Sequence, residues 1–312
     1  MPTPRRSPGR EAIDRSNPRP YAWMLSGAFV LAWMNQFAHM LKDSCDWRLI
    51  ALARALLALV FALGMARAAG AALVLWKPTA LWLRGAASSA SLLCLFYALT
   101  RIHPAEAVAL SNTVPIWVAF LSWPLIGTAP TGGVWLSALL GSAGVALMQA
   151  QHWDKMSASW ASALALLAAL TSAIAMLGLN RLRQLHPLAV VVHYSAFATV
   201  VVGAACLAGS TPSFSPLANP ATVGLLLAVG ATATVGQLCV TRAFTEGDPA
   251  RVAVVGLTQI VFALLFNTLV SQEWPHPLTV AGIALVLLPT AWVTATRAAK
   301  SAAAPEQKAE AA

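Results

Sequence analysis

Apolar residues in this chain come in long runs that are separated by short polar segments. A helix needs roughly 20 apolar residues to cross the hydrocarbon core of a bilayer, where unpaired backbone polar groups are too costly to bury. The runs predict ten such spans, at residues 21–41, 48–67, 82–101, 105–126, 132–150, 159–179, 187–208, 221–241, 250–271 and 277–296. We therefore expect an all-α polytopic membrane protein with ten transmembrane helices, surrounded by the lipid bilayer.

The composition fits a protein whose solvent is lipid. Of the 312 residues, 58% are hydrophobic and 10% are charged, against about 25% charged residues in an ordinary soluble domain. The net charge of +9 raises the question of a nucleic-acid partner, but the basic residues lie between the apolar runs and in the tails, where membrane topology requires them. We therefore predict no nucleic-acid partner. The four cysteines lack CxxC spacing, so we also predict no disulfide framework, no metal site and no cofactor.

Basic residues set the orientation, because loops rich in Lys and Arg stay in the cytoplasm. With the N-terminus inside, 15 of the 20 Lys and Arg residues fall on the cytoplasmic side, four fall outside and Arg54 lies within a span. This asymmetry predicts a multi-pass protein of the cell inner membrane. Its two tails, residues 1–20 and 297–312, are expected in the cytoplasm.

The two halves of the chain match each other when one is shifted by 145 residues. The shift superposes Gly85-Ala86 on Gly230-Ala231, Leu93-Cys94 on Leu238-Cys239, and Pro104-Ala105 on Pro249-Ala250. Each half holds five predicted spans, an odd number, so the second half enters the membrane in the opposite orientation. We therefore predict two inverted five-helix repeats, residues 21–150 and 159–296, joined by an external linker at 151–158. Inverted repeats are typical of carriers that bind their substrate between the halves.

A resemblance to a known family supports this interpretation. The run FYALTRIHPAEA at residues 96–107, followed by Pro115-Ile116-Trp117 and Leu121-Ser122-Trp123, resembles the third and fourth helices of the EamA-type drug/metabolite transporter superfamily. Residues 243–282 resemble the same unit a second time. The resemblance covers about residues 21–296 and implies ten helices, two EamA units and carrier activity toward a small metabolite.

Within that superfamily, Trp82-Leu83-Arg84-Gly85 leading into Tyr97 is similar to the branch that includes S-adenosylmethionine carriers. The sequence departs from the family pattern at Gly127-Thr128, where the first unit lacks the usual Glu. It departs again at Ile260, where the second unit lacks the proline found at Pro115. These departures weaken any transfer of residue roles from one half to the other.

Arg54 is the charged residue that lies deepest in a predicted span. A charge within the membrane is costly and usually faces a cavity or a partner. Its guanidinium would suit a substrate carboxylate or phosphate, which it can bind in bidentate fashion. Alternatively, Arg54 extends to the interface or caps the carbonyls of a neighbouring helix. No Asp or Glu lies near the centre of a predicted span, which favours a zwitterionic or anionic substrate over a cationic drug.

Three titratable residues are candidates for gating or proton coupling. Glu106, at the predicted external end of the fourth span, either complements the helix dipole or gates the external entrance. His39 and His193 lie well within spans, and histidine exchanges a proton readily near neutral pH. Each histidine either couples transport to protons or serves as a hydrogen-bonded structural residue.

A set of polar residues within the predicted spans is the candidate substrate site. Besides Arg54, it consists of Tyr97, Ser111, Asn112, Pro115, Tyr194, Gln237, Thr258 and Gln259. Pro115 has no backbone N–H, so a carbonyl one turn earlier is left free to contact substrate. The alternative is that these small polar groups hold helices together in lipid, at about 1 kcal/mol each.

The sequence therefore favours a secondary transporter that works by alternating access. Its expected cargo is an amino acid or related zwitterion or anion, with a nucleoside-type metabolite as a further candidate, and protons are the candidate coupling ion. We expect it not to be an enzyme, because the chain has no Walker A, HExxH or GxSxG motif. An intramembrane enzyme and a non-transporting sensor or scaffold are the alternatives. The sequence leaves monomer and homodimer equally open.

Overall fold

The structure is a computed structural model that describes residues 18–74, 76, 78–99, 101–102, 104–127, 129–150, 159–208, 213–271 and 276–310. The regular elements within these ranges are all helices. Those of the first half are α1 (Arg19–Met40), α2 (Trp47–Ala68), α3 (Ala80–Leu99), α4 (Pro104–Ser111), α5 (Val114–Ile126) and α6 (Gly132–Met148). Those of the second half are α7 (Trp160–Asn180), α8 (Pro187–Ala208), η2 (Ser215–Ala218), α9 (Pro220–Glu246), α10 (Pro249–Gly256), α11 (Thr258–Ser271) and α12 (Pro277–Glu310).

Two of the predicted segments have little overlap with these ranges. The predicted linker 151–158 and most of the predicted tail 1–20 lie outside the described residues. At the other end, α12 continues beyond the predicted span 277–296 and runs as a helix to Glu310.

Many of the helices are suited to a bilayer by their length and composition. Seven segments of the described chain are long and apolar enough to cross a membrane: 47–68, 106–126, 160–180, 187–208, 220–246, 249–269 and 277–295. Two shorter apolar helices lie at 80–95 and 132–148. The N-terminal helix α1 is not in this set, because Asn35, Gln36 and His39 lower its hydropathy. The chain is thus a helical, multi-pass membrane protein.

The predicted span 105–126 is not a continuous helix, because α4 ends at Ser111 and α5 begins at Val114. Pro115 explains this break, since it cannot donate a backbone hydrogen bond to the carbonyl of Ser111. At the break, the side chain of Thr113 donates to the carbonyl oxygen of Leu110 at 2.7 Å. At its far end α5 stops at Ile126 because Gly127 adopts the left-handed conformation, with a φ of 77°.

The predicted span 250–271 is interrupted in the same way, although it has no proline at the break. Here α10 ends at Gly256 and α11 begins at Thr258. The hydroxyl of Thr258 donates to the carbonyl oxygen of Val255 at 2.7 Å. A hydroxyl can replace a backbone N–H as the partner of a helix carbonyl. Thr113 and Thr258 are 145 residues apart, so residues equivalent in the predicted repeat make the same bond.

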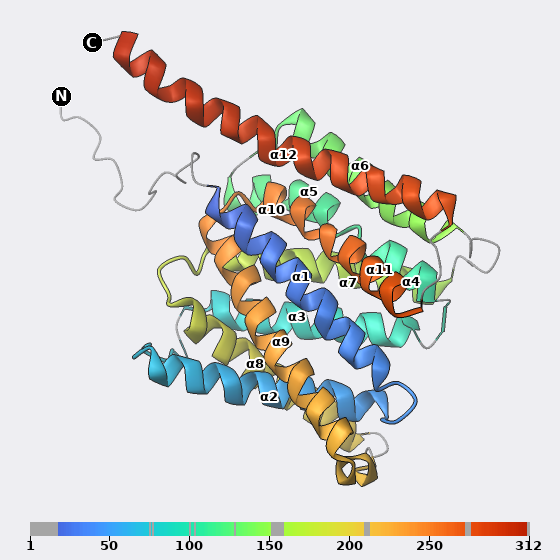
Figure 1. Ribbon diagram of the computed structural model, residues 1–312. Coiled ribbons are helices and arrows are strands. Elements are labelled where there is room, and N and C mark those ends of the chain that lie inside the picture. The colour runs from blue at the N-terminus through green and yellow to red at the C-terminus, as the bar shows by residue number, and fades with distance from the viewer. Residues whose placement is uncertain are drawn as a thin grey trace.

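The helices pack in pairs that recur between the two halves of the chain. In Figure 1, α6 and α12 lie together on one side of the bundle, while α2 and α8 lie on the opposite side. Between them α1 packs on α9 and α3 packs on α7. The contact of α2 with α9 likewise recurs between the halves as the contact of α8 with α3. The largest buried apolar cluster lies among the inner helices and includes Leu31, Leu177 and Phe244.

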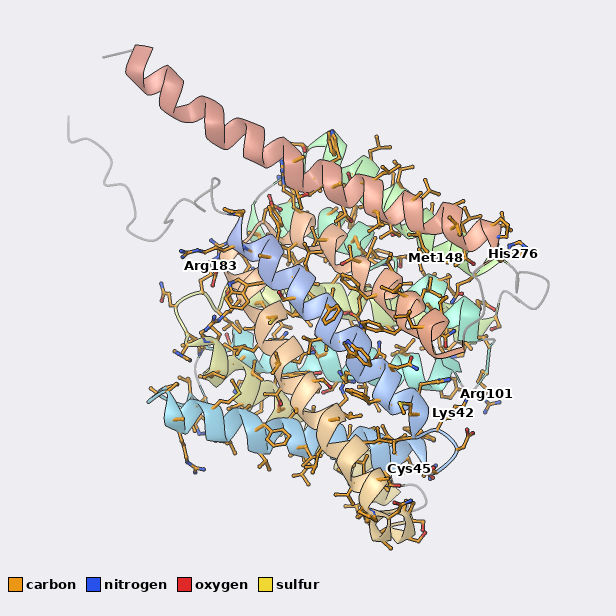
Figure 2. The ribbon with its side chains drawn as sticks, in the orientation of Figure 1. Lys42, Cys45, Arg101, Met148, Arg183 and His276 are labelled. Carbon is orange, nitrogen blue, oxygen red and sulfur yellow. The ribbon has the colours of Figure 1, made fainter. Side chains whose placement is uncertain are left out.

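The loops fall into two groups at opposite ends of the bundle. Figure 2 shows Arg183, in the connection between α7 and α8, at one end of the helices. It shows Lys42 and Cys45, in the connection between α1 and α2, at the other end, together with Arg101 and His276. The cytoplasmic and external sides predicted from charge therefore correspond to two separate ends of the molecule.

Glycines allow the helices to approach closely where they cross. A Cβ atom on Gly85 of α3 would lie 3.0 Å from the ring of Phe197, and one on Gly230 of α9 would lie 2.3 Å from Leu57 Cβ. Between α6 and α12, a Cβ on Gly282 would lie 2.5 Å from the carbonyl oxygen of Gly144. In lipid, helices associate largely through such close packing of small residues.

The contact between α6 and α12 yields a stability prediction. We expect Gly282→Ala to lower the thermal unfolding midpoint of the detergent-purified protein by about 5 °C, because overpacking typically costs about 1–3 kcal/mol. The matched control is Gly224→Ala in α9, where a new Cβ would meet no atom within 4 Å. That substitution should leave the midpoint unchanged or raise it. Equal midpoints for Gly282→Ala and the native protein would show that this crossing is looser than the structure indicates.

Candidate functional site

A cavity of about 940 Å³ lies among α1, α2, α8 and α9. It reaches the connection between α1 and α2 at one end of the bundle, where Lys42, Cys45 and Asp46 line it. Its other lining residues are Met34, Asn35, Ala38, His39, Trp47, Ile50, Ala51, Arg54, Ala55, Ala58, Leu92, Val108, Tyr194, Ser195, Ala198, Val202, Val229, Ala233 and Gln237. A cavity of this volume is within the usual range for small-molecule sites.

Helical periodicity explains why these residues face the same space. Residues three, four or seven apart lie on one face of a helix. On α2 the lining positions 47, 50, 51, 54, 55 and 58 follow this spacing, and on α9 positions 229, 233 and 237 are four apart. Small residues such as Ala51, Ala55 and Ala198 occupy several of these positions and leave room between the helices.

Basic groups predominate over acidic ones in the cavity wall. Arg54, Lys42 and His39 line it, and the Lys42 Nζ lies 3.3 Å from the Nε2 of His39. Asp46 also lines the cavity, but its carboxylate accepts a hydrogen bond from the backbone N–H of Arg48 at 2.8 Å and caps α2. Within the described part of the chain, Arg54 forms no ion pair, so the cavity suits an anionic group.

Four of the residues predicted from sequence come together here. Arg54, Tyr194 and Gln237 of the predicted substrate site line the cavity, and His39 of the predicted gating set joins them. They come from α2, α8, α9 and α1, and so from both halves of the chain.

The polar residues at the helix breaks lie elsewhere. Ser111 Oγ and Asn112 Nδ2 both donate to the carbonyl oxygen of Val108, at 3.1 and 2.8 Å. The hydroxyl of Thr258 is likewise bonded within its own helix, Pro115 is buried and Gln259 is half-buried. None of these five predicted residues is among the described residues that line the cavity.

The break beside Pro115 also contacts a neighbouring helix. The carbonyl oxygen of Asn112 accepts a hydrogen bond from Ser142 Oγ of α6 at 3.3 Å. The segment between α4 and α5 is therefore hydrogen-bonded to α6 in this conformation.

Three further predicted residues make contacts outside the cavity. Glu106 is 3% exposed and accepts a hydrogen bond from Ser162 Oγ, which links α4 to α7. His193 is buried, and its ring packs edge-on against Trp82 with the centroids 5.1 Å apart. Tyr97 is 45% exposed, and its ring lies 5.6 Å from the guanidinium carbon of Arg101.

The structure adds Arg84, which the sequence analysis counted among the cytoplasmic charges. Its side chain is 1% exposed, so it is a buried residue of α3 and not a loop charge. Its Nη2 donates to Gln237 Oε1 at 3.4 Å, and its guanidinium carbon lies 4.9 Å from the centroid of the Tyr194 ring. Arg84 therefore contacts two residues of the cavity wall from behind. The sequence signal for its burial was its position, two residues inside the predicted span 82–101.

Comparison with known proteins places the whole bundle in one group. The model of the EamA-like transporter family matches this chain twice, over residues 19–149 and 159–295. The chain is 32% identical to the pseudopaline exporter CntI of Pseudomonas aeruginosa strain UCBPP-PA14 over 227 residues, which is 71% of this chain and 77% of the exporter. The exporter of the same name in strain PAO1 is 31% identical over the same shares.

A solved structure shares the fold. A crystal structure of a protein with 18% sequence identity superposes with a TM-score of 0.77 and covers 89% of this chain and 98% of its own. At this identity the likeness concerns the fold alone.

The cysteine at the cavity mouth offers a test of the described geometry. Burial raises the pKa of the Cys45 thiol, so less of it is thiolate at neutral pH than for a free thiol. We expect its alkylation by iodoacetamide, followed by peptide mass spectrometry, to keep accelerating at a pH where glutathione has reached its plateau. At pH 8 the reaction should therefore be slower than that of glutathione. If the alkylation rate of Cys45 levels off at the same pH as that of glutathione, or at a lower pH, Cys45 is not desolvated.

Proposed function

Because this chain belongs to the EamA-like transporter family, we propose that it is a secondary transporter that carries a small metabolite across the inner membrane by alternating access. The observation that carries the proposal is the cavity of about 940 Å³ that joins helices of both halves and is lined by Arg54, Lys42 and His39. A basic cavity between two halves of a membrane protein is what a carrier of anionic groups requires.

We infer that the bundle consists of two inverted five-helix units, residues 21–150 and 159–296, with ten spans in all. Two matching helix contacts support this division. Gly85 packs against Phe197, and Gly230 packs against Leu57. The two glycines are equivalent under the 145-residue shift, and Phe197 and Leu57 each lie ten residues after the first residue of their helix, α8 and α2. Such reciprocal contacts support two halves that are related by a two-fold axis in the membrane plane.

The proposed orientation has both termini in the cytoplasm and the cavity open to the outside. It is supported by the excess of basic residues in the loops at the Arg183 end of the bundle. The cavity mouth, with Lys42 and Cys45, lies at the opposite end. The described conformation is then the outward-facing state of the cycle.

The proposed substrate is an amino acid or a related zwitterion or anion, with a nucleoside-type metabolite as the further candidate. Arg54 would bind a carboxylate or phosphate, and Tyr194 and Gln237 would bind the rest of the molecule. An amino-acid head group, as in the S-adenosylmethionine branch that the sequence resembles, meets these requirements. The relatives named as exporters support outward transport.

The remaining predicted residues have supporting roles in this proposal. His39, beside Lys42 in the cavity, is the candidate for proton coupling. The breaks at Asn112 and Leu257 act as hinges between the helix pairs, and Glu106 with Ser162 holds the external ends of α4 and α7 together. His193 packs against Trp82 and so joins α8 to α3, while Tyr97 contacts Arg101 just after the end of α3.

Removal of Arg54 should abolish most transport. The experiment uses liposomes that contain the purified protein and are loaded with a metabolite extract uniformly labelled with ¹³C, with efflux followed by mass spectrometry. We expect Arg54→Ala to slow release of the transported compounds by about tenfold or more, since a charge-assisted hydrogen bond contributes about 1.5–3 kcal/mol. The control is Arg67→Ala, an exposed residue at the other end of α2, which should transport normally. Release at the native rate by Arg54→Ala would remove Arg54 from the site.

The orientation can be tested with introduced cysteines. In right-side-out spheroplasts, we expect a membrane-impermeant maleimide to label Ala51→Cys, which lines the cavity. Ala68→Cys, exposed at the opposite end of α2, should be labelled only after permeabilisation. Peptide mass spectrometry distinguishes these sites from the native cysteines. The reverse pattern would show that the cavity opens to the cytoplasm.

A further inference from the structure

We propose that Arg84 is a second anion-binding residue, which holds the carboxylate or phosphate of the substrate on the cytoplasmic side of the cavity when the carrier faces inward. The inference rests on the proposed transport function and names the chemical group that this function requires. A substrate without an anionic group would then not be carried.

The first observation is that Arg84 is buried without an anion. Its side chain is 1% exposed, and its Nε and Nη1 have no hydrogen-bond partner. Within the described ranges it has no ion pair, and its contacts are the amide oxygen of Gln237 and the ring of Tyr194. A guanidinium carries five N–H donors. A charge buried in this way is costly unless a partner is supplied at another stage of the cycle.

Other arginines in the described chain contact protein groups that account for their positions in the structure. Arg183, which also has buried nitrogens without a hydrogen bond, lies close enough to Asp248 to interact with its charge. Arg181 donates to the carbonyl oxygen of Leu125 at 2.8 Å, and Arg242 lies 4.6 Å from the Trp23 ring centroid in a half-buried position. Arg84 differs from these because it is fully buried within a bundle helix and its cationic charge is uncompensated.

The second observation is the position of Arg84 relative to the cavity. Gln237 and Tyr194 both line the cavity, and both contact Arg84. The hydrogen bond from Arg84 to Gln237, at 3.4 Å, is long for an N–H···O bond, so a carboxylate would replace it readily. These two side chains thus form a thin layer between the guanidinium and the cavity.

The third observation comes from the relationship between the two halves. Tyr194 stands 140 residues after Arg54, at the same place in α8 as Arg54 in α2, seven residues after the helix start. Arg84 precedes Gly85, and Val229 precedes the equivalent Gly230. Both Arg54 and Val229 line the outward cavity. Tyr194 is thus the counterpart of Arg54, and Arg84 is the counterpart of Val229. The inverted equivalent of the pair Arg54 and Val229 is therefore the pair Tyr194 and Arg84, in the inner half of the membrane.

These observations define an order of events. In the outward-facing state Arg54 is open to the cavity and Arg84 is closed off by Gln237 and Tyr194. When the units rock to the inward-facing state, the layer parts and Arg84 becomes the accessible cation. During export the anionic group of the substrate binds Arg84 first and passes to Arg54. The amide oxygen of Gln237, released from Arg84, is then free to accept a hydrogen bond from a substrate ammonium group.

Two variants that remove the uncompensated charge in different ways test the proposal. Arg84→Met removes the cation and keeps much of the volume, while Gln237→Glu places a carboxylate where the amide oxygen now contacts Arg84. We expect Arg84→Met to keep or raise the thermal unfolding midpoint of the empty protein in detergent, because a buried unneutralised charge is removed. We expect Gln237→Glu to raise that midpoint by several degrees, because it gives Arg84 an internal anion. In the Arg84→Met background the gain from Gln237→Glu should disappear.

Transport by the same variants completes the test. The liposomes are loaded with the ¹³C-labelled extract. With either variant, the protein-dependent release of anionic and zwitterionic metabolites should be at least tenfold slower than with the native protein. Arg242→Met, a half-buried arginine on α9, is the matched control and should retain release. A lower midpoint for Gln237→Glu, or native release by Arg84→Met or Gln237→Glu, would overturn the role of Arg84. Release of only neutral or cationic compounds by the native protein would also overturn it, whereas no release at all would overturn the transport function itself.

Discussion

Positive charge held among apolar helices, with few carboxylates nearby, is the constraint around which this molecule is arranged. Arg54 lines the cavity in the first half of α2, and Arg84 is buried behind the cavity wall in α3. Asp46, the carboxylate in the cavity wall, is occupied as the cap of α2. Uncompensated cations in lipid are unfavourable for folding alone. Their retention is understood most simply if an anionic group of the substrate supplies the missing charge.

The helices pack closely at some crossings and leave room for the cavity elsewhere. Glycines at Gly85, Gly230, Gly144 and Gly282 bring helices together at their crossings. Away from those crossings, alanines on α2 and α8 line the cavity and leave space between the helices.

Much of the fold was predictable because apolar run length and the positions of basic residues report directly on a bilayer. Arg54, Tyr194, Gln237 and His39, which the sequence selects because polar groups in apolar runs are rare, all line the cavity. The break before Thr258 was not predicted, because a hydroxyl can end a helical turn without a proline. For the same reason, the sequence could not tell whether Ser111 and Asn112 face a cavity or bond to their own helix, and they do the latter.

Arg84 was missed because a basic residue near the start of an apolar run looks like a topology signal. Its burial depends on how α3 packs against α8 and α9, which involves residues more than 100 positions away. The central claim is that the cavity recognises an anionic group, and a thermal-unfolding screen of the purified protein against metabolites paired with their methyl esters or amides tests it most directly. A ligand that binds the folded form raises the unfolding midpoint. We expect the rise with carboxylate-bearing compounds and its loss with their neutral derivatives; equal rises for both members of each pair would contradict the claim.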